Sequence, residues 1–164
     1  MFKLNRTLTA LAVSLGLLAF LPPVLAASRY TVSANGQEVK DNKTQLVWRR
    51  CPEGMSWSVN ACVGSASGLT HQAALQQAAK VATNTGVAWR LPNVKELASI
   101  VDRSRSNPAI DTLAFPATPS NAFWSSSPYV GDTYNAWYVN FYNGYVSNSV
   151  RNGSLPVRLV RASQ

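Results

Sequence analysis

Hydrophobic and polar residues change their spacing several times along the chain, and each spacing predicts a different element. Residues 8–21 form a nearly unbroken apolar run. Two extended segments, 30–32 and 38–48, are separated by Asn35-Gly36, and Asn-Gly between extended segments is the strongest short-range signal for a β-hairpin. The stretch 51–67 is rich in Gly, Ser, Asn and Pro, which predicts a loop.

Two segments in the middle of the chain have the spacing of amphipathic helices. Residues 70–83 are nearly all Ala, Gln, Leu and Lys, and Gly86 shortly beyond is a typical stop signal. A second helix is predicted to start at Asn93, because Glu96 three residues later makes a capping box. Apolar residues at i, i+3, i+4 and i+7 predict two core-facing stripes, which comprise Leu75, Ala78, Ala79 and Ala82 in the first helix and Val94, Leu97, Ala98 and Val101 in the second.

From Ile110 onward the chain has few charges and no helical period. Residues 123–126 are predicted to form a strand, and residues 136–142 alternate between two sets of side chains as a strand with one buried face does. Asn143-Gly144 predicts a turn into a return strand at 145–146, and residues 157–160 are predicted to form a last strand. The order of strands, two helices and strands predicts an α+β fold with helices packed on a largely antiparallel sheet.

The N-terminal apolar run follows Lys3 and Arg6 and ends before Val24-Leu25-Ala26. This combination predicts a secretory signal peptide, residues 1–26, cleaved after Ala26. An uncleaved membrane anchor is the alternative, although the run is short for a span of about 20 residues. Cleavage leaves residues 27–164, a single domain without a second long apolar segment and therefore without an integral membrane segment. We expect this part to be periplasmic, extracellular or on the cell surface.

The charge of the predicted mature chain bears on its partners. The signal peptide holds two of the 15 basic residues and none of the seven acidic ones, which leaves a net charge of +6. That balance favours polyanionic partners such as an acidic polysaccharide or a negatively charged cell surface, and solubility alone explains it equally well. Nucleic acid is the weaker candidate, because the basic residues are scattered and an exported protein rarely meets it.

Cys51 and Cys62 are the only cysteines of the chain. In a protein bound for an oxidising compartment they predict a disulfide that closes the 51–67 loop. A zinc site would need two more ligands, and His71, the single histidine, cannot supply them.

Several motifs occur along the chain in a fixed order. They are Asp41-Asn42-Lys43-Thr44 before Leu46-Val47-Trp48, the Cys51 to Cys62 loop with Gly54 and Trp57, Trp89-Arg90-Leu91-Pro92-Asn93 with Glu96-Leu97, Phe115-Pro116, Phe123-Trp124-Ser125-Ser126, Ala136-Trp137-Tyr138-Val139-Asn140-Phe141, and Val157-Arg158-Leu159-Val160-Arg161. The set resembles the Lcl C-terminal domain family, a bacterial domain of unknown function. The similarity covers nearly all of residues 38–161, and Trp89-Arg90-Leu91-Pro92-Asn93 with Glu96-Leu97 is its most specific part.

The resemblance implies a C-type-lectin-like fold and a role in surface attachment, in some members to sulfated polysaccharides. Leu159 stands where many relatives have cysteine, so we expect the terminal strand to be held by packing only. Arg90 is expected to form a structural salt bridge with Asp102 or Asp111, the alternative being that it faces a ligand.

The segment from Tyr138 to Pro156 carries the functional hypothesis. Tyr supplies contact area at small entropic cost, while Ser and Asn supply adaptable hydrogen bonds, so this composition is typical of recognition surfaces. Sugars in particular stack on aromatic faces. The predicted ligand-binding residues are Tyr138, Asn140, Tyr142, Asn143, Tyr145, Ser147, Asn148, Ser149, Arg151, Asn152 and Ser154.

This segment also resembles the hypervariable tracts of lectin-fold proteins that diversity-generating retroelements rewrite at asparagine codons. A fixed polar loop with hairpin turns is the favoured interpretation. A neighbouring reverse transcriptase gene with an imperfect repeat that differs mainly at adenines would identify a diversified tract.

We expect no catalysis, because the sequence offers no obvious nucleophile, acid–base pair or metal site. His71 is expected to be exposed and ordinary, and no cofactor is expected. Of the seven carboxylates only Asp102 and Asp111 are expected to be near neighbours in the fold, so a secreted hydrolase that uses them is a remote alternative. The Glu-Pro-Asn, Gln-Pro-Asp and Trp-Asn-Asp strings of calcium-dependent lectins are absent, and we expect no calcium site.

The favoured function is therefore an exported binding module for an extracellular or cell-surface glycan or protein. A structural or assembly component of an envelope or pilus-type apparatus is the alternative. The sequence does not fix the oligomeric state.

Overall fold

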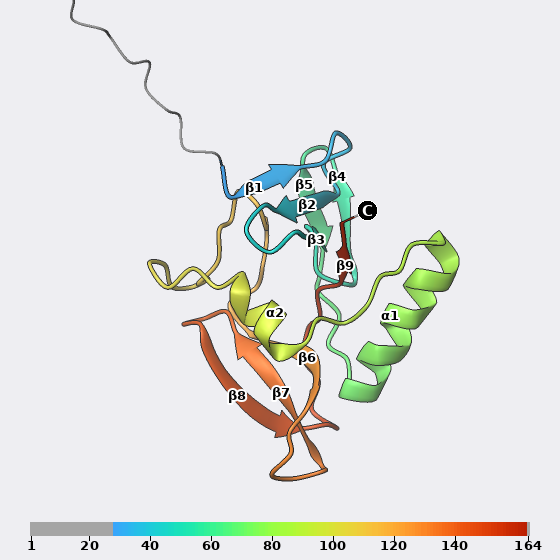
Figure 1. Cartoon of the computed structure of the whole chain (residues 1–164), viewed down its shortest axis with the longest axis vertical. Coiled ribbons are helices and arrows are strands. Elements are labelled where there is room, and N and C mark those ends of the chain that lie inside the picture. The colour runs from blue at the N-terminus through green and yellow to red at the C-terminus, as the bar shows by residue number, and fades with distance from the viewer. Residues whose placement is uncertain (1–27, 164) are drawn as a thin grey trace, which may run out of the picture.

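The computed structural model describes residues 28–163, which fold into strands and two helices (Figure 1). The predicted signal peptide lies outside the described residues. Within residues 28–163, no helix is both long enough and apolar enough to cross a bilayer. The elements in chain order are β1 (Tyr30–Val32), β2 (Glu38–Asp41), β3 (Leu46–Arg49), β4 (Met55–Ser58), β5 (Ala61–Gly64), α1 (His71–Thr85), α2 (Val94–Ser99), β6 (Ala122–Pro128), β7 (Asn135–Asn140), β8 (Tyr145–Val150) and β9 (Val160–Ala162).

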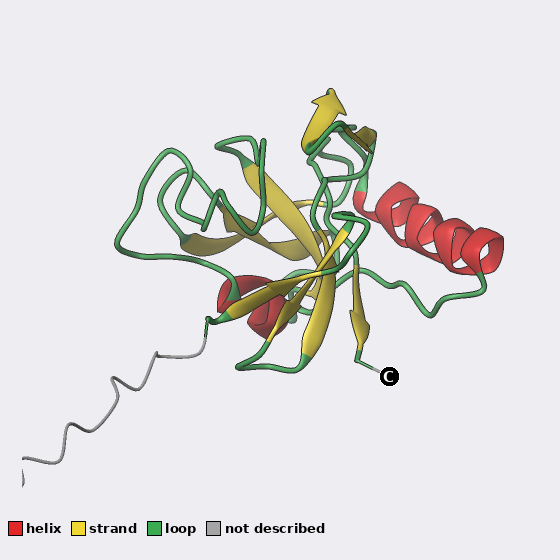
Figure 2. Ribbon diagram, turned by 90° about the horizontal axis from the view of Figure 1, so that it is seen from above, coloured by secondary structure: helices red, strands yellow, loops and turns green. Residues whose placement is uncertain are grey.

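The strands form two larger sheets and a separate hairpin. One sheet has the order β1-β2-β3-β9, the other has the order β6-β7-β8, and β4 pairs only with β5. All of these pairings are antiparallel. Helix α2 lies between the two larger sheets and α1 lies along one side of the molecule, as Figures 1 and 2 show. The α+β prediction is confirmed.

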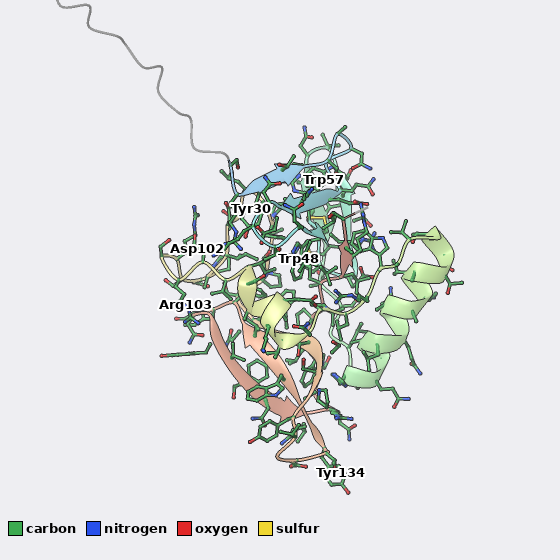
Figure 3. All side chains as sticks on the ribbon, viewed as in Figure 1. Tyr30, Trp48, Trp57, Asp102, Arg103 and Tyr134 are labelled. Atoms are coloured by element: carbon green, nitrogen blue, oxygen red, sulfur yellow. A yellow bond between two sulfur atoms is a disulfide. The ribbon has the colours of Figure 1, made fainter. Side chains whose placement is uncertain are left out.

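Two apolar clusters form the core, and both faces of the β6-β7-β8 sheet contribute to them. One cluster lies between the sheets and contains Trp48, at the centre of Figure 3, with Phe123 and Val139. The other contains Trp124 and Ala136, and it includes Ala74 and Ala78 of α1. Because a fully buried large apolar side chain contributes roughly 1.5–3 kcal/mol, these clusters hold β6 and β7 in a fixed position.

Both helices begin where the sequence predicts. The Thr70 side chain accepts from Ala73 N–H, and Asn93 and Glu96 complete the predicted capping box at the start of α2. The predicted stripe of α1 is only half right: Ala78 is buried and Ala82 packs against the core, but Leu75 is 41% exposed, Ala79 is exposed, and the other buried residues are His71 and Ala74. The stripe is rotated because His71 packs edge-on against Trp124 and its ring bonds the Ser125 carbonyl, which turns that side of the helix inward.

The predicted disulfide between Cys51 and Cys62 is confirmed, but its surroundings differ from the prediction. The supposed loop contains the β4–β5 hairpin, whose turn residues Val59 and Asn60 both have positive φ. Trp57 of this hairpin packs over Gly36, where a Cβ would lie 2.7 Å from the indole ring. The predicted extended segment 38–48 is likewise interrupted by a turn between β2 and β3.

The C-terminal strand is Val160–Ala162 rather than 157–160. Residues 157–160 are all buried, and the Arg158 side chain is fully enclosed. Its guanidinium donates to the carbonyls of Arg49 and Arg50 and to the Thr118 hydroxyl. The expectation that packing alone holds this end is therefore wrong, because buried hydrogen bonds tie it to the β3 segment.

Candidate binding surface on the β7–β8 hairpin

The turn between β7 and β8 is held by its own asparagines. Asn140 Oδ1 accepts from Tyr142 N–H at 2.9 Å, and Asn143 Oδ1 accepts from Tyr145 N–H at 3.1 Å. The Asn140 carbonyl also accepts from Gly144 N–H at 2.7 Å. Two of the predicted ligand-binding residues thus use their side-chain oxygens to fix the turn, and their side-chain N–H groups make no hydrogen bond within residues 28–163.

The turn is also docked onto the loop that follows α2. Asn107 N–H donates to the Tyr142 carbonyl at 2.9 Å, and Gly144 packs so closely that a Cβ would lie 2.6 Å from Val101 Cγ1. The positive φ of 79° at Gly144 adds a second reason for glycine there. This contact brings the basic segment that contains Arg103 and Arg105 beside the turn; Figure 3 labels Arg103.

The strand register divides the predicted site between two faces of the sheet. The pairs Asn140 with Tyr145, Tyr138 with Ser147 and Ala136 with Ser149 alternate along the hairpin and therefore share one face. Trp137 with Asn148 belongs to the opposite face. We define the hairpin face by five of the predicted residues, namely Tyr138, Asn140, Tyr145, Ser147 and Ser149.

The three tyrosines of the prediction differ in burial. Tyr142 is 53% exposed and Tyr145 is 68% exposed, and the hydroxyl of neither is hydrogen-bonded within the described residues. Tyr138 is half-buried and packs against the Trp124 cluster. The outer end of the hairpin therefore presents two aromatic rings to solvent on a rigid turn.

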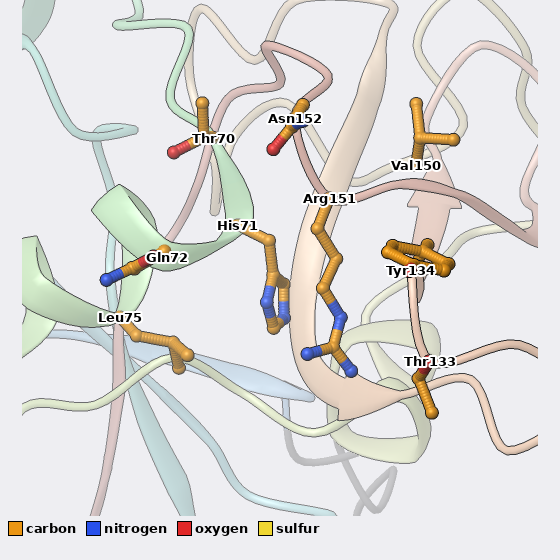
Figure 4. A pocket seen from close by; sticks show the side chains of 9 residues that line it. All are labelled: Thr70, His71, Gln72, Leu75, Thr133, Tyr134, Val150, Arg151 and Asn152. Carbon is orange, nitrogen blue, oxygen red and sulfur yellow. The ribbon is translucent and has the colours of Figure 1, made fainter.

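The remaining predicted residues lie at the other end of the hairpin. Arg151 and Asn152 follow β8 and line a pocket with the first turn of α1 (Figure 4). Five residue steps separate Tyr145 from Val150, so this base end lies about 17 Å from the turn. Ser154 does not line the pocket. It packs against Gly68, where a Cβ would lie 2.3 Å from the Ser154 Oγ.

His71 is a buried part of this pocket, and the expectation that it is exposed is wrong. Only 4% of the residue is exposed, and Nε2 lies 3.0 Å from the Ser125 carbonyl. A carbonyl can only accept, so Nε2 carries the hydrogen and Nδ1 of the neutral ring is an acceptor. Burial lowers the pKa of His71, the bond to Ser125 partly opposes this, and the positive charge of Arg151 lowers it further.

Sequence reasoning did not assign several residues of the pocket to the site. Tyr134 stands in the polar loop before β7, outside the alternation that revealed the strand. The sequence feature that could have identified Tyr134 is Asp132, two residues earlier. Its carboxylate accepts from Tyr134 N–H and so holds the backbone of this exposed tyrosine at the start of the hairpin. The other unassigned lining residues are Thr70, His71, Gln72, Leu75, Thr133 and Val150.

Every carboxylate of the described chain has a structural partner. Arg90 pairs with Glu96 at 2.7 Å, so the predicted structural salt bridge exists but its partner is neither Asp102 nor Asp111. Asp111 accepts from the N–H groups of Leu113 and Ala114. The other ion pairs are Arg29–Asp41, Arg49–Glu53, Arg105–Asp102 and Arg161–Glu38.

Comparisons with known proteins identify one family. The family model of the Lcl C-terminal domain matches residues 37–161, which is most of the chain. No curated protein and no solved structure matches significantly.

Proposed function

The chain belongs to the Lcl C-terminal domain family, and from that premise we propose that it is an exported, non-catalytic module that binds an extracellular or cell-surface glycan or protein. The recognition surface is the hairpin face together with the turn. The observation that carries the proposal is the pair of exposed rings, Tyr142 and Tyr145, on a turn whose backbone is hydrogen-bonded to its own asparagines and to Asn107.

The chemistry of this end suits a carbohydrate or a protein surface. A tyrosine ring buries a large area with few rotatable bonds, and a fixed backbone reduces the entropy that binding must overcome. The amide groups of Asn140 and Asn143 add donors next to the rings.

The distribution of charge supports an anionic partner. Five of the seven carboxylates pair with arginines, so the excess positive charge remains on other residues. Arg103 lies in the loop beside the turn, is exposed, and makes no salt bridge within residues 28–163. Its position favours anions at the aromatic end of the hairpin.

The carboxylate environments argue against a hydrolase. Glycoside cleavage needs a general acid whose pKa is raised, whereas hydrogen bonds from Ser104 lower the pKa of Asp102. Asp111 is occupied by two backbone N–H groups of its own turn. The disulfide supports export, because such bonds persist in oxidising compartments. The C-type-lectin-like architecture remains an expectation from the family.

The test compares the wild-type protein with Tyr142→Ala/Tyr145→Ala on a glycan array, on a heparin column and against intact cell surfaces. We expect the double variant to lose at least tenfold in affinity for whichever partner the wild type retains, since each exposed tyrosine at a contact centre is worth about 1 kcal/mol or more. Leu113→Ala is the matched control, because Leu113 is 81% exposed and lies in another loop. Equal retention of all three proteins would refute this surface.

One observation favours the alternative role in envelope assembly. Strand β8 is an edge of its sheet, contains no charged residue, and exposes Val146 and Val150. Edge strands usually carry charges or proline that prevent pairing with other chains. Crosslinking from intact cells through a cysteine placed at Asn148 would identify a stoichiometric envelope partner, and a monomeric product would remove this role.

A further inference from the structure

A pocket of about 580 Å³ opens at the base of the hairpin (Figure 4). Its walls come from three separate parts of the chain, namely the first turn of α1, the loop at residues 133–134, and residues 150–152. This volume is typical of sites for small ligands. Backbone hydrogen bonds join these three parts: Arg151 N–H donates to the Tyr134 carbonyl, and His71 N–H donates to the Arg151 carbonyl.

Arg151 gives the pocket a fixed positive end. Its Nε donates to the Asn135 carbonyl at 3.1 Å, which orients the guanidinium. Neither terminal nitrogen has a protein acceptor among residues 28–163, and in Figure 4 the side chain extends between the rings of His71 and Tyr134. Two free, coplanar N–H groups match the two oxygens of one carboxylate.

No carboxylate competes for this arginine inside the pocket. None of the lining residues is acidic, and the first turn of α1 has no acidic side chain. Asp132, the nearest acid in sequence, directs its two oxygens to Tyr134 N–H and to the Asn135 amide. His71 is neutral near pH 7, because burial lowers its pKa from the ordinary value of 6.5. Arg151 is therefore the one charged side chain among the residues that line the pocket.

The other walls suit a sugar ring rather than a purely apolar group. Tyr134 is 78% exposed, and Leu75 and Val150 extend the apolar side of the pocket that its ring begins. Gln72, Thr133 and Asn152 are exposed polar residues of the lining whose side chains make no hydrogen bond within the described chain. A pyranose offers an apolar face to an aromatic ring and hydroxyl groups to amides and hydroxyls.

We infer that this pocket binds a hexuronate unit, a pyranose that carries one carboxylate, with the carboxylate on the Arg151 fork and the ring against Tyr134. A single arginine matches a single carboxylate, whereas a densely sulfated sugar needs several cations. The inference rests on the proposed function and extends it. The pocket lies at the base of the hairpin, about 17 Å along β8 from Tyr145.

The direct test is titration of the folded, disulfide-bonded protein with D-glucuronate and D-galacturonate, followed by amide NMR at low salt. We expect saturable shifts of Tyr134, Arg151 and Asn152. D-glucose reports the contribution of the ring alone, glucose 6-sulfate reports a sulfate in place of the carboxylate, and N-acetylalanine reports a peptide-type carboxylate. At least one uronate must bind more tightly than all three of these probes; equal or tighter binding of any of them overturns the assignment.

Two variants locate the binding. Arg151→Gln removes the fork and should weaken uronate binding about tenfold or more. Because this change also removes the bond to Asn135, Tyr134→Ala provides a second test that leaves the bond intact, and we expect it to weaken binding severalfold. Lys43→Gln, which removes an exposed cation in the turn between β2 and β3, should change binding less than twofold. Unaltered binding in both pocket variants overturns the inference.

The two proposals fail separately. If uronates do not shift the pocket amides while Tyr142→Ala/Tyr145→Ala still loses its partner, only the hexuronate inference is wrong. If uronates bind the pocket and the tyrosine variant keeps every partner, the hairpin turn is not the recognition surface and the pocket stands alone.

Discussion

Thr118 is the most informative position for the stability of the fold, because its hydroxyl serves two buried groups. It accepts from Arg158 Nη2 at 2.6 Å and donates to the Phe115 carbonyl at 2.8 Å. Arg158 is fully buried, and burial, followed by the nearby charge of Arg50, lowers its pKa to about 9. It therefore remains charged at pH 7, and Thr118→Val leaves one N–H of a buried cation without an acceptor.

The expected loss follows from these two bonds. A hydrogen bond to a charged group contributes about 1.5–3 kcal/mol and a neutral one about 1 kcal/mol. The added methyl of valine offsets about 0.8 kcal/mol through apolar burial. Arg158 has no alternative acceptor to replace the Thr118 hydroxyl, since even its Nε lacks a partner within the described residues. We expect Thr118→Val to lower the free energy of unfolding by about 2–3 kcal/mol.

Urea unfolding at pH 7 with the disulfide intact measures this change, and the buried Trp48 and Trp124 provide the fluorescence signal. Thr112→Val is the matched control, because Thr112 is exposed and its side chain makes no hydrogen bond in the described chain. We expect the control to change stability by less than about 0.5 kcal/mol. If the two variants unfold at the same urea concentration, Arg158 does not depend on Thr118 and the reasoning fails.

Three further measurements test other parts of the scaffold. Replacing both Cys51 and Cys62 with alanine should cost about 3 kcal/mol in urea unfolding, as expected for a closed loop whose ends are 11 residues apart, and a reductant should then have no further effect. Asn93→Ala should cost about 1 kcal/mol, because it removes the side-chain bond to Glu96 N–H at the start of α2; a loss below about 0.3 kcal/mol would mean that the cap is unimportant. Burial lowers the pKa of His71 in the folded protein, so below about pH 6.5 the unfolded chain binds a proton that the folded chain does not, and stability should fall as the pH drops below about 6.5. His71→Phe should remove this slope, and a slope that persists in the variant would assign it to other groups.

Local sequence signals were sufficient to predict those caps and turns whose contacts all lie within a few residues of one another. A capping box depends on Asn93 and Glu96 alone, and the Asn35-Gly36 turn depends on one glycine that adopts positive φ. The β4–β5 hairpin had no such signal, because its turn places Val59 and Asn60 at positive φ. A valine in that conformation is uncommon, so the surrounding hairpin and the nearby disulfide must enforce it.

Two features that the sequence did not predict, the buried side of α1 and the division of the candidate site, depend on contacts between distant segments. The inward side of α1 depends on Ser125 and Trp124, which lie more than 50 residues away and draw His71 into the core. The division of the candidate site has a similar origin. The tract from Tyr138 to Ser154 is continuous in sequence, but antiparallel pairing places its residues on two faces and at two ends of a hairpin.

The buried Arg158 shows why charge patterns mislead near the C-terminus. A basic residue between valine and leucine is normally expected at the surface, because burying its charge is costly. Here the segment before β9 lies next to the end of β3, so the Arg158 guanidinium donates to the carbonyls of Arg49 and Arg50, and its central carbon lies 5.0 Å from the centre of the Phe115 ring. Those acceptors come from residues more than 100 positions earlier in the chain. The same arrangement holds Leu159 in the core without a covalent link, so the hairpin that precedes it is anchored to the core at its base while Tyr142 and Tyr145 stay exposed at its outer end.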